Sequence, residues 1–137
     1  MAEAARRARG LLDTSVVVDM DGISASRLPL EVAVSAITMA ELAAGPHAAD
    51  NATERALRQD RLQRAEAAFD SLPFDGEAAR AYGRVYAAMV GAGRKARGPR
   101  AVDLLIAATA LAARLPLYTR NADDFRPLDD LLDVVVV

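Results

Sequence analysis

Acidic residues that could hold a metal ion occur at four places along the chain, each close to a short apolar segment. They are Asp13, Glu41, Asp103 and the pair Asp123 and Asp124, which the amide of Asn121 precedes. Carboxylates that lie close together repel one another, and a bound divalent cation neutralises that repulsion. The chain has no cysteine and one histidine, so any metal bound here must take oxygen ligands, which favours Mg²⁺ or Mn²⁺.

The same counts exclude several other kinds of chemistry. Without cysteine there is no disulfide framework, thiolate zinc site, iron–sulfur cluster or cysteine nucleophile. A Ser–His–Asp triad would have to use His47, the single histidine. The sequence has no glycine-rich phosphate-binding loop. Its one lysine, Lys95, is in the wrong place for a phosphoacceptor receiver domain.

The length of 137 residues predicts a single domain, residues 1–137. The basic N-terminus is followed by only a short apolar run, so we expect a soluble cytoplasmic protein without a secretory signal or a membrane-spanning helix. The net charge is −2, but segment 78–102 has six basic and no acidic residues. A weakly acidic chain can therefore present a basic face to a polyanion.

Short apolar runs alternate with longer helical patterns along the chain. The runs, which predict buried strands, are 11–12, 32–36, 71–74, 116–118 and 133–137. Apolar residues at helical spacing predict helices at 38–46, 51–69, 76–90 and 102–115, the last of them buried. This alternation predicts an α/β fold, a three-layer sandwich in which a central parallel sheet is flanked by helices.

In a parallel sheet the carboxyl ends of all strands meet at one edge, where ligands bind. We expect Asp13 at the end of the first strand, and Glu41 and Asp103 each in the first turn of a helix. Structural interpretations are also open, because Thr38 and Glu41 match a capping box. Asn121 could cap a helix, and Asp103 could complement a helix dipole. A cap does not explain a carboxylate at the end of a buried strand, where Asp13 would be costly without a partner.

Four short segments within residues 11–125 carry these acids. They are Leu11-Leu-Asp13-Thr-Ser-Val-Val-Val-Asp19, Ser35-Ala-Ile-Thr-Met-Ala-Glu41-Leu-Ala-Ala-Gly45, Arg100-Ala-Val-Asp103-Leu-Leu-Ile-Ala-Ala-Thr-Ala110 and Leu117-Tyr-Thr-Arg-Asn121-Ala-Asp-Asp124-Phe125. Together they resemble PIN-domain proteins, particularly the VapC-type toxins of bacterial VapBC toxin–antitoxin pairs. The resemblance implies a PIN-like fold and a metal-dependent endoribonuclease with Asp13, Glu41 and Asp103 as acidic metal-site residues.

One position departs from the family pattern. Many relatives have aspartate where this chain has Asn121. We favour Asp124 as the fourth metal ligand, with Asp123 or the amide oxygen of Asn121 as alternatives. Without a well-placed histidine, a metal-activated water is the expected nucleophile, which leaves 5′-phosphate and 3′-hydroxyl ends on the RNA.

The resemblance also implies partners, namely an RNA substrate, a second copy of the chain in a homodimer, and a VapB-like antitoxin whose tail lies over the cleft. Hydroxyl groups that could support the metal ligands belong to Thr14, Ser15, Ser35 and Thr119. Basic residues that could hold RNA phosphates are Arg94, Lys95, Arg97, Arg100 and Arg120. The alternative function is a catalytically inactive PIN-like domain that binds RNA or a protein, which the departure at Asn121 favours.

Overall fold

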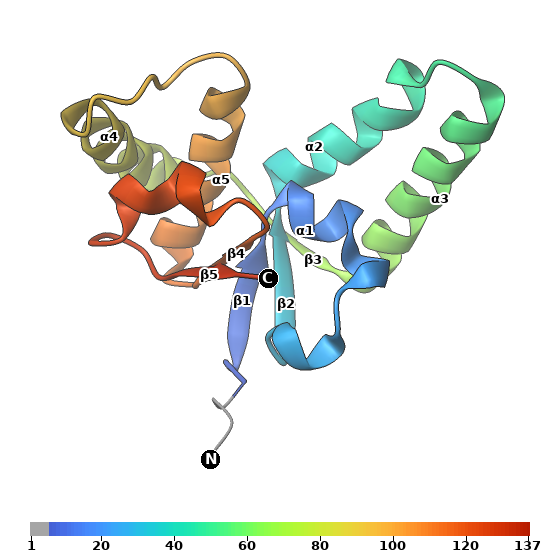
Figure 1. Cartoon of the computed structure of the whole chain (residues 1–137), viewed down its shortest axis with the longest axis horizontal. Coiled ribbons are helices and arrows are strands. Elements are labelled where there is room, and N and C mark those ends of the chain that lie inside the picture. Colours follow the sequence, from blue (N-terminus) through green and yellow to red (C-terminus); the bar gives the residue numbers. More distant parts are fainter. Residues whose placement is uncertain (1–5) are drawn as a thin grey trace.

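Five short strands form a parallel sheet at the centre of the protein (Figure 1). The computed structural model describes residues 6–137, apart from the side chain of Pro99. The strands are β1 (Arg9–Leu12), β2 (Glu31–Ser35), β3 (Asp70–Leu72), β4 (Leu117–Thr119) and β5 (Val134–Val136), in the spatial order β3-β2-β1-β4-β5. All neighbouring pairs are parallel, so the carboxyl ends share one edge. The predicted parallel sheet is confirmed, and each predicted strand overlaps an observed one.

Helices cover both faces of the sheet. The α-helices are α1 (Thr14–Val18), α2 (Ala36–Ala44), α3 (Ala52–Ala68), α4 (Gly76–Gly91) and α5 (Pro99–Ala113). Short 3₁₀ helices are η1 (Met20–Gly22), η2 (Ala25–Arg27), η3 (Gly45–Ala48) and η4 (Ala122–Leu128). Figure 1 shows α2 and α3 on one side of the molecule and α4 and α5 on the other. No helix within residues 6–137 is long and apolar enough to cross a membrane.

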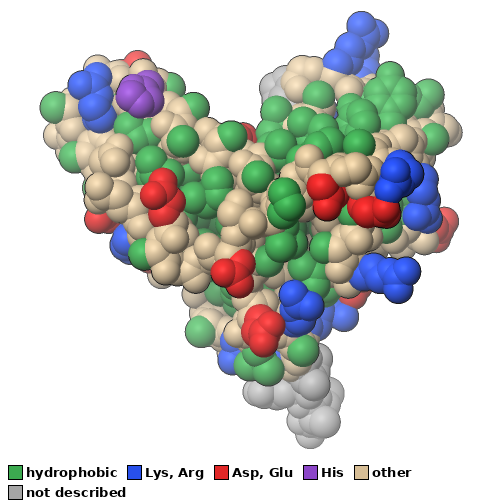
Figure 2. All heavy atoms as spheres, turned by 180° about the vertical axis from the view of Figure 1, so that it is seen from behind, with side chains coloured by type: hydrophobic (Ala, Val, Ile, Leu, Met, Phe, Trp, Pro, Cys, Tyr) green, Lys and Arg blue, Asp and Glu red, His purple; other side chains and the backbone are tan. Residues whose placement is uncertain are grey.

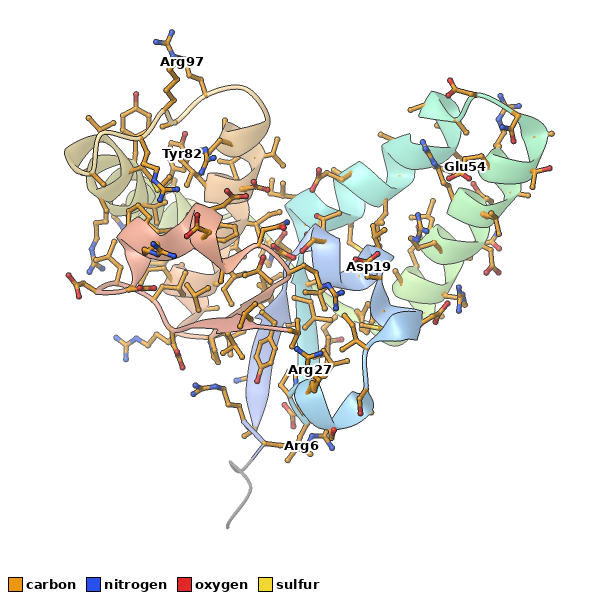
Figure 3. All side chains as sticks on the ribbon, viewed as in Figure 1. Arg6, Asp19, Arg27, Glu54, Tyr82 and Arg97 are labelled. Carbon is orange, nitrogen blue, oxygen red and sulfur yellow. The ribbon has the colours of Figure 1, made fainter. Side chains whose placement is uncertain are left out.

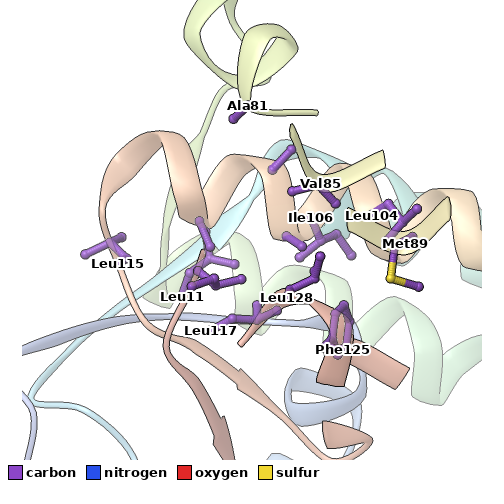
Figure 4. Close-up of a cluster of buried hydrophobic side chains, with 14 of the residues drawn as sticks. Leu11, Ala81, Val85, Met89, Leu104, Ile106, Leu115, Leu117, Phe125 and Leu128 are labelled. Carbon is purple, nitrogen blue, oxygen red and sulfur yellow. The ribbon is translucent and has the colours of Figure 1, made fainter. Parts of the chain in front are cut away.

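Successive strand residues point to opposite faces and so build two separate cores. Leu11 of β1 packs with the apolar faces of α4, α5 and η4, whereas Leu12 packs with Val16 and Val17 of α1 and Ala65 of α3. Figure 4 shows the first of these cores, in which Leu104 and Phe125 are also buried. Layers of helix, sheet and helix confirm the predicted three-layer sandwich.

Two helices begin earlier than their apolar patterns predicted. The α2 helix begins at Ala36 because the Ser35 side chain caps it, accepting a hydrogen bond from the Thr38 backbone N–H at 3.0 Å. Pro99, at the first position of α5, follows Gly98 with φ 70°. Glu41 and Asp103 therefore lie in the second turns of their helices, and their expected first-turn positions were wrong.

The capping interpretations are corrected in the same way. The capping box expected from Thr38 and Glu41 does not form, because Ser35 is the capping residue of α2. Asn121 does precede η4, but its side chain makes no capping hydrogen bond. Glu41 and the Asn121 side chain therefore make no helix-capping hydrogen bond.

A close approach at Gly10 fixes how β1 meets β4. A Cβ atom added to Gly10 would lie 2.5 Å from Cε1 of Tyr118 and 3.0 Å from Cγ of Pro29. The Tyr118 ring is buried, with 3% of its surface exposed, so it has little room to move. Glycine at this position lets the ring lie against the backbone of β1.

We expect Gly10→Ala to lower the free energy of unfolding by about 1–3 kcal/mol, because the added methyl group overpacks the Tyr118 site. The matched control is Gly83→Ala on α4, where nothing lies within 4 Å of the added Cβ. That change should instead stabilise the protein by about 0.5–1 kcal/mol, because alanine is the better helix former. Urea denaturation followed by circular dichroism measures both, and equal effects of the two substitutions would contradict the packing argument.

Candidate active site

The candidate site lies where the strand order reverses, between β1 and its neighbours β2 and β4. Ligands bind at such switch points in parallel sheets because the chain leaves the adjacent strands in opposite directions. Asp13 directly follows β1, while Ser35 ends β2 and Thr119 ends β4. The Asp13 N–H donates to the carbonyl of Tyr118 at 2.9 Å, which continues the β1–β4 pairing up to the site. Three polar side chains thus meet at the predicted edge.

Asp13 is buried, with 4% of its surface exposed, and its carboxylate is held by hydrogen bonds. Its Oδ1 accepts from the Ser15 hydroxyl at 2.5 Å and from the Val16 N–H at 3.2 Å. Its Oδ2 accepts from the Thr119 hydroxyl at 2.5 Å. Burial raises the pKa of Asp13 above its ordinary value, and these hydrogen bonds oppose that rise. The bond to Val16 also caps α1, so Asp13 has a structural role as well.

Ser15 and Thr119 connect Asp13 to the segment that leads into η4. The Ser15 hydroxyl accepts from the Arg120 N–H at 3.1 Å, and the Thr119 hydroxyl accepts from the Asn121 N–H at 3.0 Å. Both hydroxyls therefore donate to Asp13 and accept from the 120–121 backbone. Asp13 is therefore fixed both to α1 and to the end of β4.

Glu41 is held by a second group of hydroxyls. The Thr14 hydroxyl lies 2.5 Å from Glu41 Oε1 and 3.0 Å from the Thr38 hydroxyl. Ser35 in turn donates to the Thr38 hydroxyl at 3.2 Å. Sequence reasoning treated Thr38 only as a capping residue, yet it is fully buried between Ser35 and Thr14. The Ser35-x-x-Thr38 spacing after a buried strand was the available signal.

Asp103 is half-buried on α5, and its surroundings disfavour its charged form. Burial, and then repulsion by Asp13, Glu41 and Asp124, raises the pKa of Asp103 to about 6, while the Arg100 charge opposes the rise. The charges of acids on three other segments, at the end of β1, on α2 and on η4, therefore act on Asp103 of α5. Asp13, Glu41 and Asp124 thus lie near enough to Asp103 for their charges to act on it. Since α5 follows α4 and not a strand, the position of Asp103 does not follow from the sheet topology.

The other two candidates for the fourth position are placed differently. Asp123 is exposed and its carboxylate pairs with Arg126 of the same 3₁₀ helix. Asn121 is exposed too, and contributes its backbone N–H to Thr119 rather than its amide. Asp124 is half-buried and electrostatically coupled to Asp103. The geometry therefore favours Asp124 as the fourth acid.

The donor set suits a hard divalent cation. The carboxylates of Asp13, Glu41, Asp103 and Asp124 are all oxygen donors, and the charges of the other three disfavour the charged form of Asp103. In the part of the chain described, no three acidic or histidine side chains are already arranged to hold an ion. Binding would thus draw side chains such as the exposed Glu41 inward, with water completing the ligand shell.

The predicted RNA-binding residues fall into two groups. Three of them contact the site's own segments: Arg94 the carbonyl of Asp123, Arg100 the carbonyl and carboxylate of Asp124, and Arg120 the carboxylate of Asp19. Lys95 and Arg97 are exposed on the loop between α4 and α5, and Figure 3 shows Arg97 pointing away from the sheet. Three of the five basic residues predicted to bind RNA therefore contact segments of the acidic site, and the sequence pattern did not indicate these contacts.

Fold and site together define an α/β protein with an acidic, oxygen-donor centre at the carboxyl edge of a parallel sheet. The family model of the PIN domain matches residues 10–131, and the chain belongs to this family. It is 35% identical over 133 residues to Ribonuclease VapC5 of Mycobacterium tuberculosis, covering 95% of each chain.

Solved structures agree with this assignment. The crystal structure of VapBC-5 from Mycobacterium tuberculosis matches with a TM-score of 0.78 and 35% identity, over 95% of this chain and 98% of that one. FitAcB from Neisseria gonorrhoeae matches with a TM-score of 0.63 and 28% identity, over 92% and 94% of the two chains. The resemblance drawn from the four sequence segments is confirmed.

Because its charged form is disfavoured, Asp103 should destabilise the fold at neutral pH. Its pKa rises from 3.8 to about 6 on folding, so the folded state binds more protons between these values. Stability is therefore lost as the pH rises through this window. We expect Asp103→Asn to raise stability at pH 7.5 by on the order of 1 kcal/mol, after allowing for solvent screening at this half-buried position, with no gain near pH 4.

Thermal unfolding between pH 4 and 8 measures this effect. The control is Asp123→Asn, an exposed acid that should change stability by less than about 0.5 kcal/mol. Added Mg²⁺ should stabilise the unsubstituted protein more than Asp103→Asn, since a bound ion removes the same repulsion. If Asp103→Asn instead lowers the stability at pH 7.5, the charged carboxylate of Asp103 does not destabilise the fold.

Proposed function

We propose that this PIN-domain protein is a metal-dependent endoribonuclease and the toxin of a VapBC-type toxin–antitoxin pair. The observation that carries the proposal is the buried carboxylate of Asp13, which the hydroxyls of Ser15 and Thr119 hold at the carboxyl edge of the sheet. Glu41, Asp103 and Asp124 add three further acids from separate segments. The name Ribonuclease VapC5 of the relative from Mycobacterium tuberculosis supports the activity. We propose the cytoplasm, where RNA substrates are available, as its location.

Asp13, Asp103 and Asp124 would hold Mg²⁺ or Mn²⁺, with Glu41 as a further ligand or as the group that orients a water molecule. The bound ion supplies positive charge beside the scissile phosphate and makes a bound water more acidic. The Thr14 hydroxyl holds Glu41 in place, and Ser15 and Thr119 fix the orientation of Asp13. These hydroxyls keep both carboxylates aimed before RNA arrives.

Water, rather than the RNA 2′-hydroxyl, should be the nucleophile. Activation of the 2′-hydroxyl usually needs a nearby base such as histidine. The single histidine, His47, is exposed on η3, beyond the end of α2. Cleavage should therefore leave 5′-phosphate and 3′-hydroxyl ends. Lys95 and Arg97, exposed on the α4–α5 loop, are the proposed contacts to more distant phosphates.

An apolar groove beside the site offers a surface for the antitoxin. A cavity of about 380 Å³ between α1, η1 and α3 is lined by residues that include Val18, Leu57 and Arg61. Val18 and Arg61 also line a second cavity that reaches Thr14 and Glu41. Val18 is 42% and Leu57 57% exposed, so both present apolar surface to a partner. A VapB-like antitoxin seated here would lie next to the carboxylates.

A different face would serve the proposed homodimer. Tyr86 and Val90 of α4 are 46% and 53% exposed, and Tyr86 lies against Tyr82 with ring centroids 6.0 Å apart. Figure 2 shows apolar side chains gathered over the half of the molecule that α4 and α5 form. Such a surface favours contact with a second copy, away from the antitoxin groove.

Cleavage of total cellular RNA by the purified protein, with Mg²⁺ or Mn²⁺ or with EDTA, tests the activity. We expect discrete metal-dependent cuts that disappear with EDTA and in Asp13→Asn and Asp103→Asn. Two adjacent acids provide a matched comparison. Asp124→Asn should lower the rate of RNA cleavage about 10- to 100-fold, and Asp123→Asn should lower it less than about twofold. Mapped 2′,3′-cyclic phosphate ends would contradict the proposed nucleophile. RNA binding without cleavage under either metal would instead favour the catalytically inactive binding domain.

Binding of the cognate VapB-like antitoxin tests the groove. We expect Leu57→Asp to weaken the complex at least about tenfold, because it buries a charge among apolar contacts. The matched control is Leu30→Asp, since Leu30 is 64% exposed and lines neither cavity. Isothermal titration calorimetry measures both affinities, and RNA cleavage by Leu57→Asp should stay unchanged. Equal affinities of the two variants would place the antitoxin elsewhere.

A further inference from the structure

Two arginines that flank the start of α5 hold η4 by its backbone. Arg94 Nη1 donates to the carbonyl of Asp123 at 3.1 Å, and Arg100 Nη1 donates to the carbonyl of Asp124 at 3.2 Å. Arg100 Nη2 also lies 3.5 Å from Asp124 Oδ1. Of this pair, Arg100 alone touches a carboxylate of the site.

The contact between Arg100 and Asp124 is partly shielded from solvent. The Arg100 side chain is 30% exposed and that of Asp124 43%. Ion pairs in such positions are weakened by water but are not fully screened. The Asp124 charge is one of three that disfavour the charged form of Asp103, and the Arg100 charge opposes their effect at Asp103, three residues further along α5. Arg100 thus neutralises part of the charge that a metal ion would neutralise.

Contacts other than those of Arg100 also hold η4 in place. Phe125 and Leu128 of η4 are 1% and 0% exposed in the core beneath α4 and α5. Arg94 holds the neighbouring carbonyl independently. Loss of the Arg100 side chain should therefore leave η4 in place and chiefly remove a positive charge from Asp124.

We propose that Arg100 is the resident counter-ion of Asp124, a positioning residue that holds this carboxylate until a divalent cation replaces it. The inference rests on the proposed metal-dependent function. Because the guanidinium lies against Asp124 Oδ1, it competes with a cation for this carboxylate, and Arg100 lowers the affinity of the site for metal. While no metal is bound, Arg100 also keeps the Asp124 carboxylate from turning into solvent or pairing with another cation.

Mn²⁺ binding without RNA, followed by the electron paramagnetic resonance signal of the free ion, tests this competition. We expect Arg100→Gln to bind Mn²⁺ about fivefold more tightly, and Arg100→Lys, which keeps the charge, to resemble the unsubstituted protein. Arg94→Gln is the matched control, because Arg94 contacts η4 but no site carboxylate, and its affinity should not change. In an Asp124→Asn background, Arg100→Gln should have no further effect.

Each other outcome overturns the inference in a distinct way. Unchanged Mn²⁺ affinity in Arg100→Gln, with weaker and less salt-dependent RNA binding, would assign Arg100 to RNA phosphates and leave the nuclease function standing. Weaker Mn²⁺ binding would show that Arg100 supports the site instead of competing for it. If the unsubstituted protein binds no Mn²⁺, the metal-dependent function itself fails. Circular dichroism checks folding, and Arg100→Met tests the same charge loss if Arg100→Gln does not fold.

Discussion

The rest of the site depends on one constraint, the burial of the Asp13 carboxylate at the end of a central strand. A buried charge must be hydrogen-bonded, or it becomes neutral or destabilises the fold. Asp13 meets this requirement with the hydroxyls of Ser15 and Thr119 and the N–H of Val16. Those partners lie on α1 and at the end of β4, so satisfying one charge fixes how three elements meet. The same hydroxyls then set the path of the chain into η4.

One carboxylate of the site stabilises the fold and another destabilises it. Asp13 caps α1, which stabilises the fold, whereas crowding raises the pKa of Asp103 and opposes folding at neutral pH. Functional sites commonly retain destabilising interactions that selection for stability alone would remove. Here a divalent cation would remove the repulsion, so the metal-free protein holds the acids together through its hydroxyls and its cores.

The basic residues follow from the same electrostatic requirement. A chain with net charge −2 gathers four acids at one edge, and three of its nearby arginines contact the backbone or acids around them. An arginine beside a carboxylate is available to a phosphate only when that carboxylate has another partner. Charge density along the sequence is therefore a poor guide to which cations RNA would meet.

The amino-acid sequence by itself predicted the five strands, the four longer helices, the three-layer sandwich and the place of Asp13 at the carboxyl edge of the sheet, but neither α1 nor the 3₁₀ helices η1, η2 and η4. It could do so because hydrophobic periodicity is local, and a parallel sheet necessarily brings strand ends to one edge. The sequence favoured Asp124 over Asp123 without a structural reason, and the tertiary structure supplies one, because Asp123 pairs with Arg126 whereas the Asp124 charge acts on Asp103. Tertiary structure alone decided that Thr119 holds Asp13 across 106 residues of sequence. Asp123 and Asp124 are equivalent as sequence neighbours. The packing of η4, with Phe125 and Leu128 buried, sets Asp124 toward the site and leaves Asp123 to pair with Arg126. The direction of a side chain and its ionic partner depend on segments that are distant in sequence, and local pattern carries no information about them.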